Sequence, residues 1–241
     1  MTVTRKKIEK NLAKIRENIA KACEESRRDP SDVKIVAVTK SVDVETIKNL
    51  LDAGLTTFGE NKVQQLTQRA EELAKYLKRR RNPLPAPVSW HMIGHLQRNK
   101  VKQVVKCASM IHSVDSLRLA EELSNRAVAE SQEYQLLLQV NCSQENQKFG
   151  CAVGASLHLA EMIATLPGLK LRGLMTMGPM TGEPVATENS FVRLRELFEE
   201  IRHDKIGGSD FTELSMGMSG DYEIAVRQGA TIVRIGSALF E

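Results

Sequence analysis

Eight short apolar segments that alternate with segments of helical periodicity constrain this 241-residue chain more than any other feature. The first segment, residues 33–40 (VKIVAVTK), is a nearly continuous run of apolar, β-branched or small residues. Such a run is typical of a strand that is buried on both faces of a parallel sheet covered by helices. Seven further strands are expected at residues 55–60, 88–94, 110–114, 135–140, 171–177, 212–215 and 231–235.

Helical periodicity marks the segments between these strands. Apolar residues recur on one helical face between Ile8 and Cys23, which predicts an amphipathic helix over residues 6–25. No helix is expected after the eighth strand, so this N-terminal helix supplies the eighth helix. The other helices are expected at residues 44–53, 61–80, 99–107, 117–131, 155–166, 188–203 and 222–228.

Strict alternation of strand and helix implies parallel strands joined by right-handed crossovers, and eight such units close into a barrel. The sequence therefore predicts an α/β fold: a single-domain (β/α)8 TIM barrel over residues 1–241 with an extra N-terminal helix. An open, doubly wound sheet is the alternative. Against it, no G-x-G-x-x-G motif follows the first strand, and no candidate domain boundary divides the pattern.

Composition argues against several classes of protein. No apolar run reaches the roughly 18 residues of a membrane span, and the N-terminal segment lacks the apolar core of a signal peptide. The four cysteines are scattered without metal-ligand spacing, which indicates reduced thiols in a cytoplasmic protein and no metal site. The one basic run, residues 78–81, has no interleaved aromatic residues, so we expect a solvated loop rather than a nucleic-acid contact.

Polar residues gather at the carboxyl ends of the expected strands, where barrels of this kind carry their chemistry. Lys40 stands at the tip of the first strand, where burial would favour the neutral amine that attacks a carbonyl. Taken alone, Lys40 fits better as a solvated lysine at a loop edge. Asn61 and His95 stand at the ends of the second and third strands.

Two turns of small residues follow the seventh and eighth strands. Residues 215–221 (SMGMSGD) lead into a helix whose free N–H groups suit an anion. The eighth strand ends in residues 234–237 (RIGS). Glycine and serine also serve simply as turn and cap residues. However, the loops after strands seven and eight form the common phosphate site of such barrels, which favours a phosphate ligand.

A phosphate site together with a lysine at a strand tip indicates a phosphorylated aldehyde. Pyridoxal 5′-phosphate satisfies both, because its aldehyde forms a Schiff base with lysine and its ring nitrogen needs an Asp or Arg partner. Arg234 stands beside the two turns and can be that partner. Its permanent charge would keep the ring nitrogen unprotonated, so the cofactor would be a weaker electron sink than with a carboxylate partner.

Six segments carry a resemblance to a known family in their order and spacing. They are AVTK, FGENKVQ, WHMIGHLQRNKVK, VNCSQENQKFG, GLMTMGP and SMGMSGDYEIAVRQGATIVRIGSALF. Nearly the whole chain resembles the single-domain pyridoxal phosphate homeostasis protein family. This resemblance implies a barrel like the N-terminal domain of alanine racemase.

The resemblance also implies where the cofactor binds. Lys40 is implied to carry it, and Arg234 to face the pyridine nitrogen. Asn61 and His95 lie in family motifs close to the site. The residues implied around the phosphate are Ser215, Ser219, Gly236 and Ser237, and Gly217 is also expected to bind the cofactor.

Two functions of different classes follow from this reading. The first is a cytoplasmic, monomeric protein that binds pyridoxal phosphate, buffers or delivers it to apo-enzymes, and has no catalytic residues or turnover of its own. The alternative is an amino-acid racemase, which needs a base on each face of the substrate Cα. Lys40 can serve one face. The expected second base is a tyrosine, but Tyr76, Tyr134 and Tyr222 fall within helices or at a strand start. A Schiff-base aldolase would use Lys40 without needing Arg234. The absence of a second domain favours homeostasis.

Overall fold

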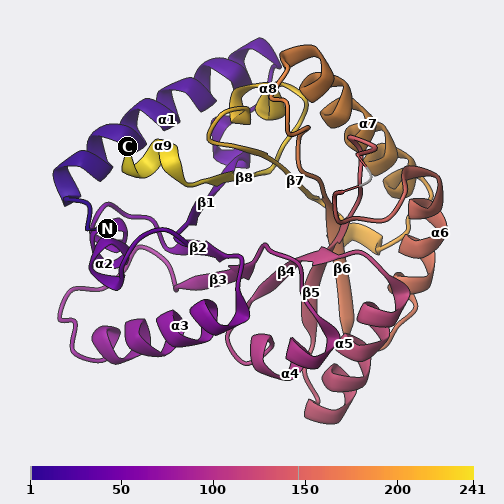
Figure 1. Cartoon of the computed structure of the whole chain (residues 1–241), viewed down its shortest axis with the longest axis horizontal. Helices are drawn as coiled ribbons and strands as arrows, with labels where there is room; N and C mark the ends of the chain where they lie inside the picture. Colours follow the sequence, from indigo (N-terminus) through magenta and orange to yellow (C-terminus); the bar gives the residue numbers. More distant parts are fainter. Residues whose placement is uncertain (1, 146) are drawn as a thin grey trace.

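The computed structural model describes residues 2–145 and 147–241, and within them eight parallel strands close into a barrel (Figure 1). Each strand pairs with the next along the chain, and β8 pairs with β1, from Lys34 opposite Ile232 to Ala37 opposite Ile235. This closure confirms the predicted α/β barrel and excludes the open sheet. The strands are β1 (Lys34–Val38), β2 (Thr57–Glu60), β3 (Ser89–Met92), β4 (Met110–Val114), β5 (Tyr134–Gln139), β6 (Leu169–Met175), β7 (Glu213–Met218) and β8 (Ile232–Ile235).

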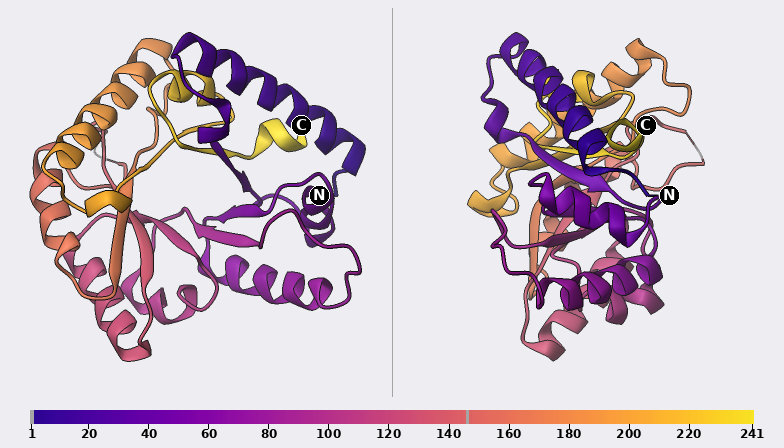
Figure 2. Two further views of the ribbon diagram at one scale, coloured as in Figure 1. Left: turned by 180° about the vertical axis from the view of Figure 1, so that it is seen from behind. Right: turned by 90° about the vertical axis from the view of Figure 1, so that its left-hand side faces the viewer.

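Helices surround the barrel, as the front and rear views show (Figures 1 and 2). The N-terminal helix α1 packs against α2, α8 and α9, and so closes the ring between the end of the chain and its beginning. The α-helices are α1 (Arg5–Glu25), α2 (Val44–Asp52), α3 (Val63–Leu77), α4 (Val101–Val104), α5 (Leu117–Glu130), α6 (Val153–Ala164), α7 (Pro184–His203), α8 (Tyr222–Arg227) and α9 (Ser237–Phe240). Short 3₁₀ turns are η1 (Pro30–Asp32), η2 (Arg98–Lys100) and η3 (Gly208–Asp210).

Two expectations about the helices were wrong. A one-turn helix, α9, follows β8, where we expected none. It buries Leu239 and Phe240 beside α1. The helix expected over residues 99–107 is instead the turn η2 followed by the single turn α4. Within α4, only Val101 and Val104 are buried, so one turn is enough to place both side chains in the core.

The seventh strand is longer than the sequence predicted, because it continues through Met218 rather than ending at Ser215. Its pairing with β8 shifts register between these two residues, as at a β-bulge. Gly217 lies at this bulge with φ +91°. A Cβ at position 217 would approach the Ala225 Cβ to 2.6 Å. The small-residue turn therefore begins after Met218, with Ser219 as its first residue.

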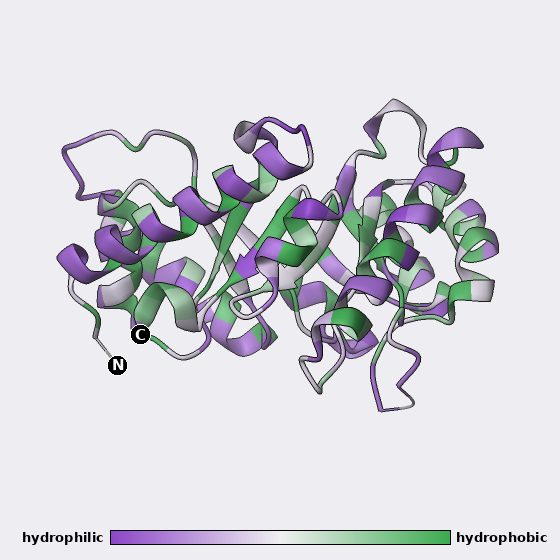
Figure 3. Ribbon diagram, turned by 90° about the horizontal axis from the view of Figure 1, so that it is seen from above, coloured by the Kyte–Doolittle hydropathy of each residue, from purple (hydrophilic) through white to green (hydrophobic). Residues whose placement is uncertain are grey.

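The core has two parts. Most apolar side chains pack between the outer faces of the strands and the helices, while a smaller cluster fills the interior of the barrel. Figure 3 shows hydrophobic strands enclosed by helices whose outer turns are hydrophilic. Among the described residues, no helix is both long enough and apolar enough to cross a bilayer. The interior cluster comprises Val36, Met110, Leu137, Met175 and Ile232.

Candidate functional site

A cavity of about 700 Å³ opens at the carboxyl ends of the strands. Its walls come from the ends of β1, β5, β7 and β8 and from the segments that follow β1, β2, β3, β5, β6, β7 and β8. The topology of the barrel therefore joins positions that are far apart in the chain. Seven of the nine predicted site residues line this cavity: Lys40, Asn61, His95, Ser219, Arg234, Gly236 and Ser237.

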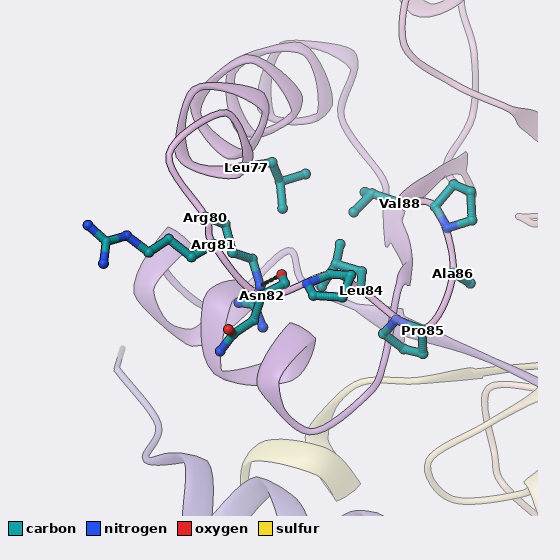
Figure 4. A pocket seen from close by; sticks show the side chains of 10 residues that line it. Leu77, Arg80, Arg81, Asn82, Leu84, Pro85, Ala86 and Val88 are labelled. Atoms are coloured by element: carbon teal, nitrogen blue, oxygen red, sulfur yellow. Dashed lines mark hydrogen bonds between the residues drawn. The ribbon is translucent and has the colours of Figure 1, made fainter.

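A second hollow, of about 570 Å³, lies on the flank of the barrel. It is lined by residues 80–88 of one proline-rich loop together with the end of α3 (Figure 4). The loop contains part of the basic run that we expected to be solvated. Arg79 and Arg81 are exposed, whereas Arg80 pairs with Asp52 at 2.7 Å. Because this hollow gathers no strand ends from around the barrel, we assign it no chemistry.

Lys40 reaches the cavity from a tight turn that follows β1. The bond from Val42 N to Thr39 O, at 3.0 Å, closes this turn, and Thr39 N donates to Gly59 O at 3.1 Å. The Lys40 side chain is exposed at the cavity. This exposure agrees with the reading of Lys40 as a solvated lysine at a loop edge. The alternative, burial at the strand tip, is not found, because β1 ends at Val38, two residues before Lys40.

Arg234 extends from β8 and is only 4% exposed. Its Nη1 donates to Ser215 Oγ at 2.7 Å, and its Nη2 donates to the carbonyl oxygen of Thr176 at 2.8 Å. Burial lowers the pKa of Arg234 to about 10, although the carboxylate of Asp221 acts in the opposite direction. The guanidinium therefore stays charged at neutral pH and provides a fixed cation in the cavity wall.

A chain of hydrogen bonds runs from Arg234 through the interior of the barrel. Ser215 Oγ lies 3.0 Å from His112 Nδ1, and His112 Nε2 lies 2.8 Å from His91 Nδ1. His91 Nε2 then lies 3.1 Å from Ser89 Oγ. Because β4 and β7 are not neighbours in the sheet, the contact between His112 and Ser215 crosses the barrel. The chain thus joins the cavity to the amino-terminal end of the strands.

The two ends of this chain determine the direction of every bond in it. At one end Arg234 can only donate. At the other end Ser109 Oγ donates to the carbonyl oxygen of Trp90 at 3.0 Å and lies 2.6 Å from Ser89 Oγ. With both histidines neutral, all bonds are made only if each hydroxyl donates away from Arg234. Each histidine then carries its proton on Nε2.

Burial agrees with neutral histidines in this chain. His91 is 4% exposed and His112 is fully buried. Burial lowers the pKa of His91 to about 3, and the cation of Lys34 adds to this effect. The pKa of His112 is well below its ordinary value, chiefly through burial and then through His91 and Arg234. The chain therefore holds Arg234 in place without adding a second charge to the barrel interior.

The loops after β7 and β8 lie side by side, as the phosphate hypothesis requires. Ser219 Oγ accepts bonds from Gly236 N at 3.1 Å and from Ala238 N at 3.2 Å. Ser219, Gly236 and Ser237 all line the cavity. The serine hydroxyls of these loops can donate to an anion, although Glu241 also lines this cavity. Ser215 and Gly217 stand behind this wall and do not line the cavity.

Asn61 and His95 line another part of the cavity. The His95 ring stacks on that of Phe149 at a centroid distance of 4.0 Å, and its Nδ1 lies 3.6 Å from Asp115 Oδ2. Phe149 is 53% exposed. It belongs to the segment VNCSQENQKFG, of which residue 146 lies outside the described residues. This ring therefore forms part of the cavity mouth.

Sequence reasoning missed two groups of residues at the site. Phe149 and Met218 contribute apolar wall, but an exposed loop residue and an exposed residue at the end of a strand carry no periodic signal. His91 and His112 stand behind Arg234, and here a signal existed. Each is a histidine inside an expected strand that is otherwise mostly apolar, which indicates a polar side chain that needs a buried partner.

Comparison with known sequences gives a consistent result. A family model described as "Alanine racemase, N-terminal domain" matches residues 10–241. A relative from Pseudomonas aeruginosa, named pyridoxal phosphate homeostasis protein, is 40% identical over 233 residues. The match spans 97% of this chain and 94% of the relative.

Two of the similar solved structures differ in how much of their length this chain covers. The structure of PipY from Synechococcus elongatus PCC7942, described as having PLP bound, matches with a TM-score of 0.81 at 32% identity. The match covers 97% of this chain and 100% of PipY. An alanine racemase of Clostridium difficile 630 matches with a TM-score of 0.71 at 15% identity, which shows the fold alone. That match covers 99% of this chain but 56% of the racemase.

Proposed function

This chain belongs to the pyridoxal phosphate homeostasis protein family, and from that premise we propose that it binds pyridoxal 5′-phosphate and takes part in homeostasis of this cofactor. One observation carries the proposal. A single cavity gathers an amine from Lys40, a fixed guanidinium from Arg234 and a set of anion donors from the loops after β7 and β8. The names of the Pseudomonas relative and of PipY with PLP bound support the choice of ligand.

Each part of the cavity fits one part of this cofactor. When bound, pyridoxal phosphate supplies an aldehyde that a primary amine can hold covalently and a ring that withdraws electrons. Lys40, the lysine in the cavity wall, would hold the aldehyde carbon. Arg234 would face the ring nitrogen and keep it unprotonated, because a buried guanidinium bonded to Ser215 and Thr176 has only donors to offer.

The phosphate would lie against Ser219, Gly236 and Ser237, which all line the cavity. In this proposal Ser215 and Gly217 act from behind the wall. Ser215 accepts from Arg234 and so fixes the guanidinium, while Gly217 forms the bulge that places Ser219 beside β8. Asn61 and His95 would enclose the cofactor at the other walls of the cavity.

We further propose that the protein handles the cofactor without turning over a substrate. A racemase would need a second base, for which tyrosine is the expected side chain. None of the chain's three tyrosines lines the cavity. Tyr134 Oη bonds to Glu130, and Tyr222 Oη accepts from Asn18, both away from the cavity. The arginine at the ring nitrogen also disfavours a racemase, because it weakens the electron sink.

The remaining parts of the proposal concern the protein's setting. We propose a monomeric, cytoplasmic protein of one domain that gives its cofactor to apo-enzymes and binds neither nucleic acid nor membrane. The four cysteines, Cys23, Cys107, Cys142 and Cys151, are all free thiols, which agrees with a reducing compartment. Size-exclusion chromatography with light scattering tests the monomer, and cofactor transfer to an apo-enzyme tests delivery.

Covalent trapping tests the cofactor proposal. The purified full-length chain, loaded with pyridoxal phosphate, should be yellow, and borohydride reduction followed by peptide mapping should place one pyridoxyl group on Lys40. Lys40→Ala should abolish the label while the phosphate still binds. Label on Lys62, Lys100 or Lys148 in place of Lys40 would contradict the assignment. Enzyme-like racemisation of any common amino acid, lost in Lys40→Ala, would contradict the absence of turnover.

A further inference from the structure

A buried ion pair outside the predicted site joins Arg69 of α3 to Glu60 at the end of β2. The Glu60 side chain is fully buried and that of Arg69 is 13% exposed, which makes this the most deeply buried pair in the part of the chain that the structure describes. Coulomb attraction only partly offsets the cost of taking two charges out of water. Stability alone therefore does not account for this pair.

Arg69 holds the backbone of the turn that carries Lys40. Its Nη1 donates to the carbonyl oxygen of Thr39 at 2.6 Å, and its Nη2 donates to the carbonyl oxygen of Val42 at 2.5 Å. These two carbonyls belong to the first and last residues of the turn. One planar guanidinium thus fixes both ends of the turn, with Lys40 and Ser41 between them.

Glu60 fixes the same turn through its carboxylate. Its Oε1 accepts from Arg69 Nη1 and from the hydroxyl of Thr39, the latter at 2.5 Å. Its Oε2 has no partner among the described residues. Every hydrogen bond of this carboxylate within the described chain is therefore directed at Arg69 or at the first residue of the Lys40 turn.

The Lys40 side chain itself has no hydrogen bond or ion pair with the residues that the structure describes. It is also exposed, so packing does not fix its direction. The turn is then the element that aims the lysine into the cavity. Because Arg69 and Glu60 hold that turn, they determine where the amine can reach.

We propose that Arg69, supported by Glu60, is a positioning residue that aims the Lys40 amine at the aldehyde of the cofactor. This inference rests on the proposed function, in which Lys40 holds pyridoxal phosphate. In the attachment a C=N bond forms between Lys40 Nζ and the aldehyde carbon, and the aldehyde oxygen leaves as water with the two amine protons. Arg69 acts on the reach and orientation of the amine, and the phosphate is held by separate loops after β7 and β8.

Arg69→Lys is the informative substitution. An ammonium keeps the charge opposite Glu60, which protects the fold, but it lacks the planar fork that binds two carbonyls at once. The attachment rate should fall by about tenfold or more, since misplacement of a reacting group by about 1 Å can cost about a hundredfold. Stopped-flow absorbance with pyridoxal 5′-phosphate measures this rate in the full-length protein.

A second ligand separates positioning from general damage to the cavity. Pyridoxine 5′-phosphate has an alcohol in place of the aldehyde, so it uses the phosphate and ring contacts without attaching to Lys40. Titration calorimetry should give the same affinity for this ligand in Arg69→Lys and in the unchanged protein. Equal affinity also shows that the variant is folded around its cavity.

Arg80 offers a matched control close to the end of the same helix. Its side chain is 16% exposed, close to the 13% of Arg69, and it pairs with the more exposed Asp52 at 2.7 Å. It also donates to the carbonyl oxygen of Asn82 at 3.0 Å. It makes no contact with the Lys40 turn. Arg80→Lys should change neither the attachment rate nor the affinity for pyridoxine phosphate.

The outcomes distinguish this inference from the proposed function. Attachment at the unchanged rate in Arg69→Lys, with the label still on Lys40, would overturn the inference alone. Parallel loss of affinity for both ligands would also overturn it, because a structural defect would explain the result. Label on a lysine other than Lys40 in the unchanged protein would overturn the proposed function and this inference together. Slow attachment in Arg69→Lys, with normal affinity for pyridoxine phosphate, supports the inference about Arg69.

Discussion

The two basic groups of the cavity stand on neighbouring strands but are held in different ways. Lys40 is exposed and has no side-chain partner within the described residues, and its turn is held from outside the barrel by the charged pair of Arg69 and Glu60. Arg234 is buried and held from inside the barrel by a neutral chain that begins with Ser215 and His112. One region fixes the backbone and leaves the side chain free, whereas the other fixes the side chain itself.

The difference matches what each group has to do in the proposed function. An amine that attaches and releases a ligand has to move, so only its point of origin can be fixed. A guanidinium that sets the charge state of a ring nitrogen has to stay in place and stay charged. Neutral histidines suit this second task, because a further cation in the barrel interior would repel Arg234 across a medium that screens charge weakly.

The largest effect is expected from breaking the charged pair in the Lys40 region. Glu60→Ala leaves Arg69 with a buried, unpaired charge, and loss of one partner from a buried ion pair costs about 3–5 kcal/mol in the free energy of unfolding. Urea denaturation of the full-length protein measures this loss. Glu9→Ala, which removes the exposed pair with Arg5, is the control and should leave the midpoint unchanged. A comparably small effect for Glu60→Ala would mean that the pair is open to solvent.

The sequence predicted the positions of Lys40, Arg234 and the phosphate loops better than it predicted the exposure of Lys40. Alternation of strands and helices placed Lys40, Arg234 and the loops after β7 and β8 at one end of a barrel, because parallel strands present their carboxyl ends on the same side. The apolar run of β1 also suggested burial of Lys40. However, β1 stops at Val38, two residues before Lys40. No periodic pattern in the sequence marks the residue at which a buried strand ends.

The supports of the site were harder to predict than the site itself. Glu60 and Arg69 are nine positions apart and meet only because α3 folds back over the end of β2. His112 and Ser215 are 103 positions apart and meet only through closure of the barrel. Polar pairs between different elements depend on the register of the strands and on strand length. A single sequence predicts neither the register nor the strand length to within one residue.

The second-largest expected effect is a pH dependence of the free energy of unfolding. It arises from the neutral histidines in the hydrogen-bonded chain behind Arg234. The unfolded chain protonates each histidine near pH 6.5, whereas burial lowers the pKa of His91 to about 3 and that of His112 well below its ordinary value. Below about pH 6.5 the unfolded state therefore binds more protons than the native state, so stability falls as pH drops towards 3. The slope approaches about 1.4 kcal/mol per pH unit for each histidine.

Urea denaturation at several values between about pH 7 and 5 measures this slope, in a range where most carboxylates remain ionised. Imidazole ¹⁵N shifts in the native protein give the independent readout. His91 and His112 should both remain neutral with the proton on Nε2 across this range, and the exposed His158 provides the reference imidazole signal. Native-state protonation of His91 above pH 5, or a proton on its Nδ1, would contradict the direction of the chain.

The smallest effect is expected at the phosphate loops, which belong to the Arg234 region. Replacing Ser219 and Ser237 together by alanine removes two hydroxyls from the cavity wall but leaves the N–H groups of Gly236 and Ala238 in place. Hydrogen bonds to charged groups contribute about 1.5–3 kcal/mol each, so affinity should fall by about tenfold or more. Ser41→Ala, in the cavity wall beside Lys40, is the matched control and should have little effect.

The double serine variant also sharpens the contrast between the two regions. It should weaken pyridoxal phosphate and pyridoxine phosphate equally, because both ligands carry the phosphate. Arg69→Lys should instead slow only the attachment of the aldehyde. Calorimetric titration of both ligands into both variants, with stopped-flow rates for the aldehyde, completes the comparison. Unchanged affinity of both ligands in the double variant would place the phosphate elsewhere in the cavity, and the Arg234 region would then hold only the ring.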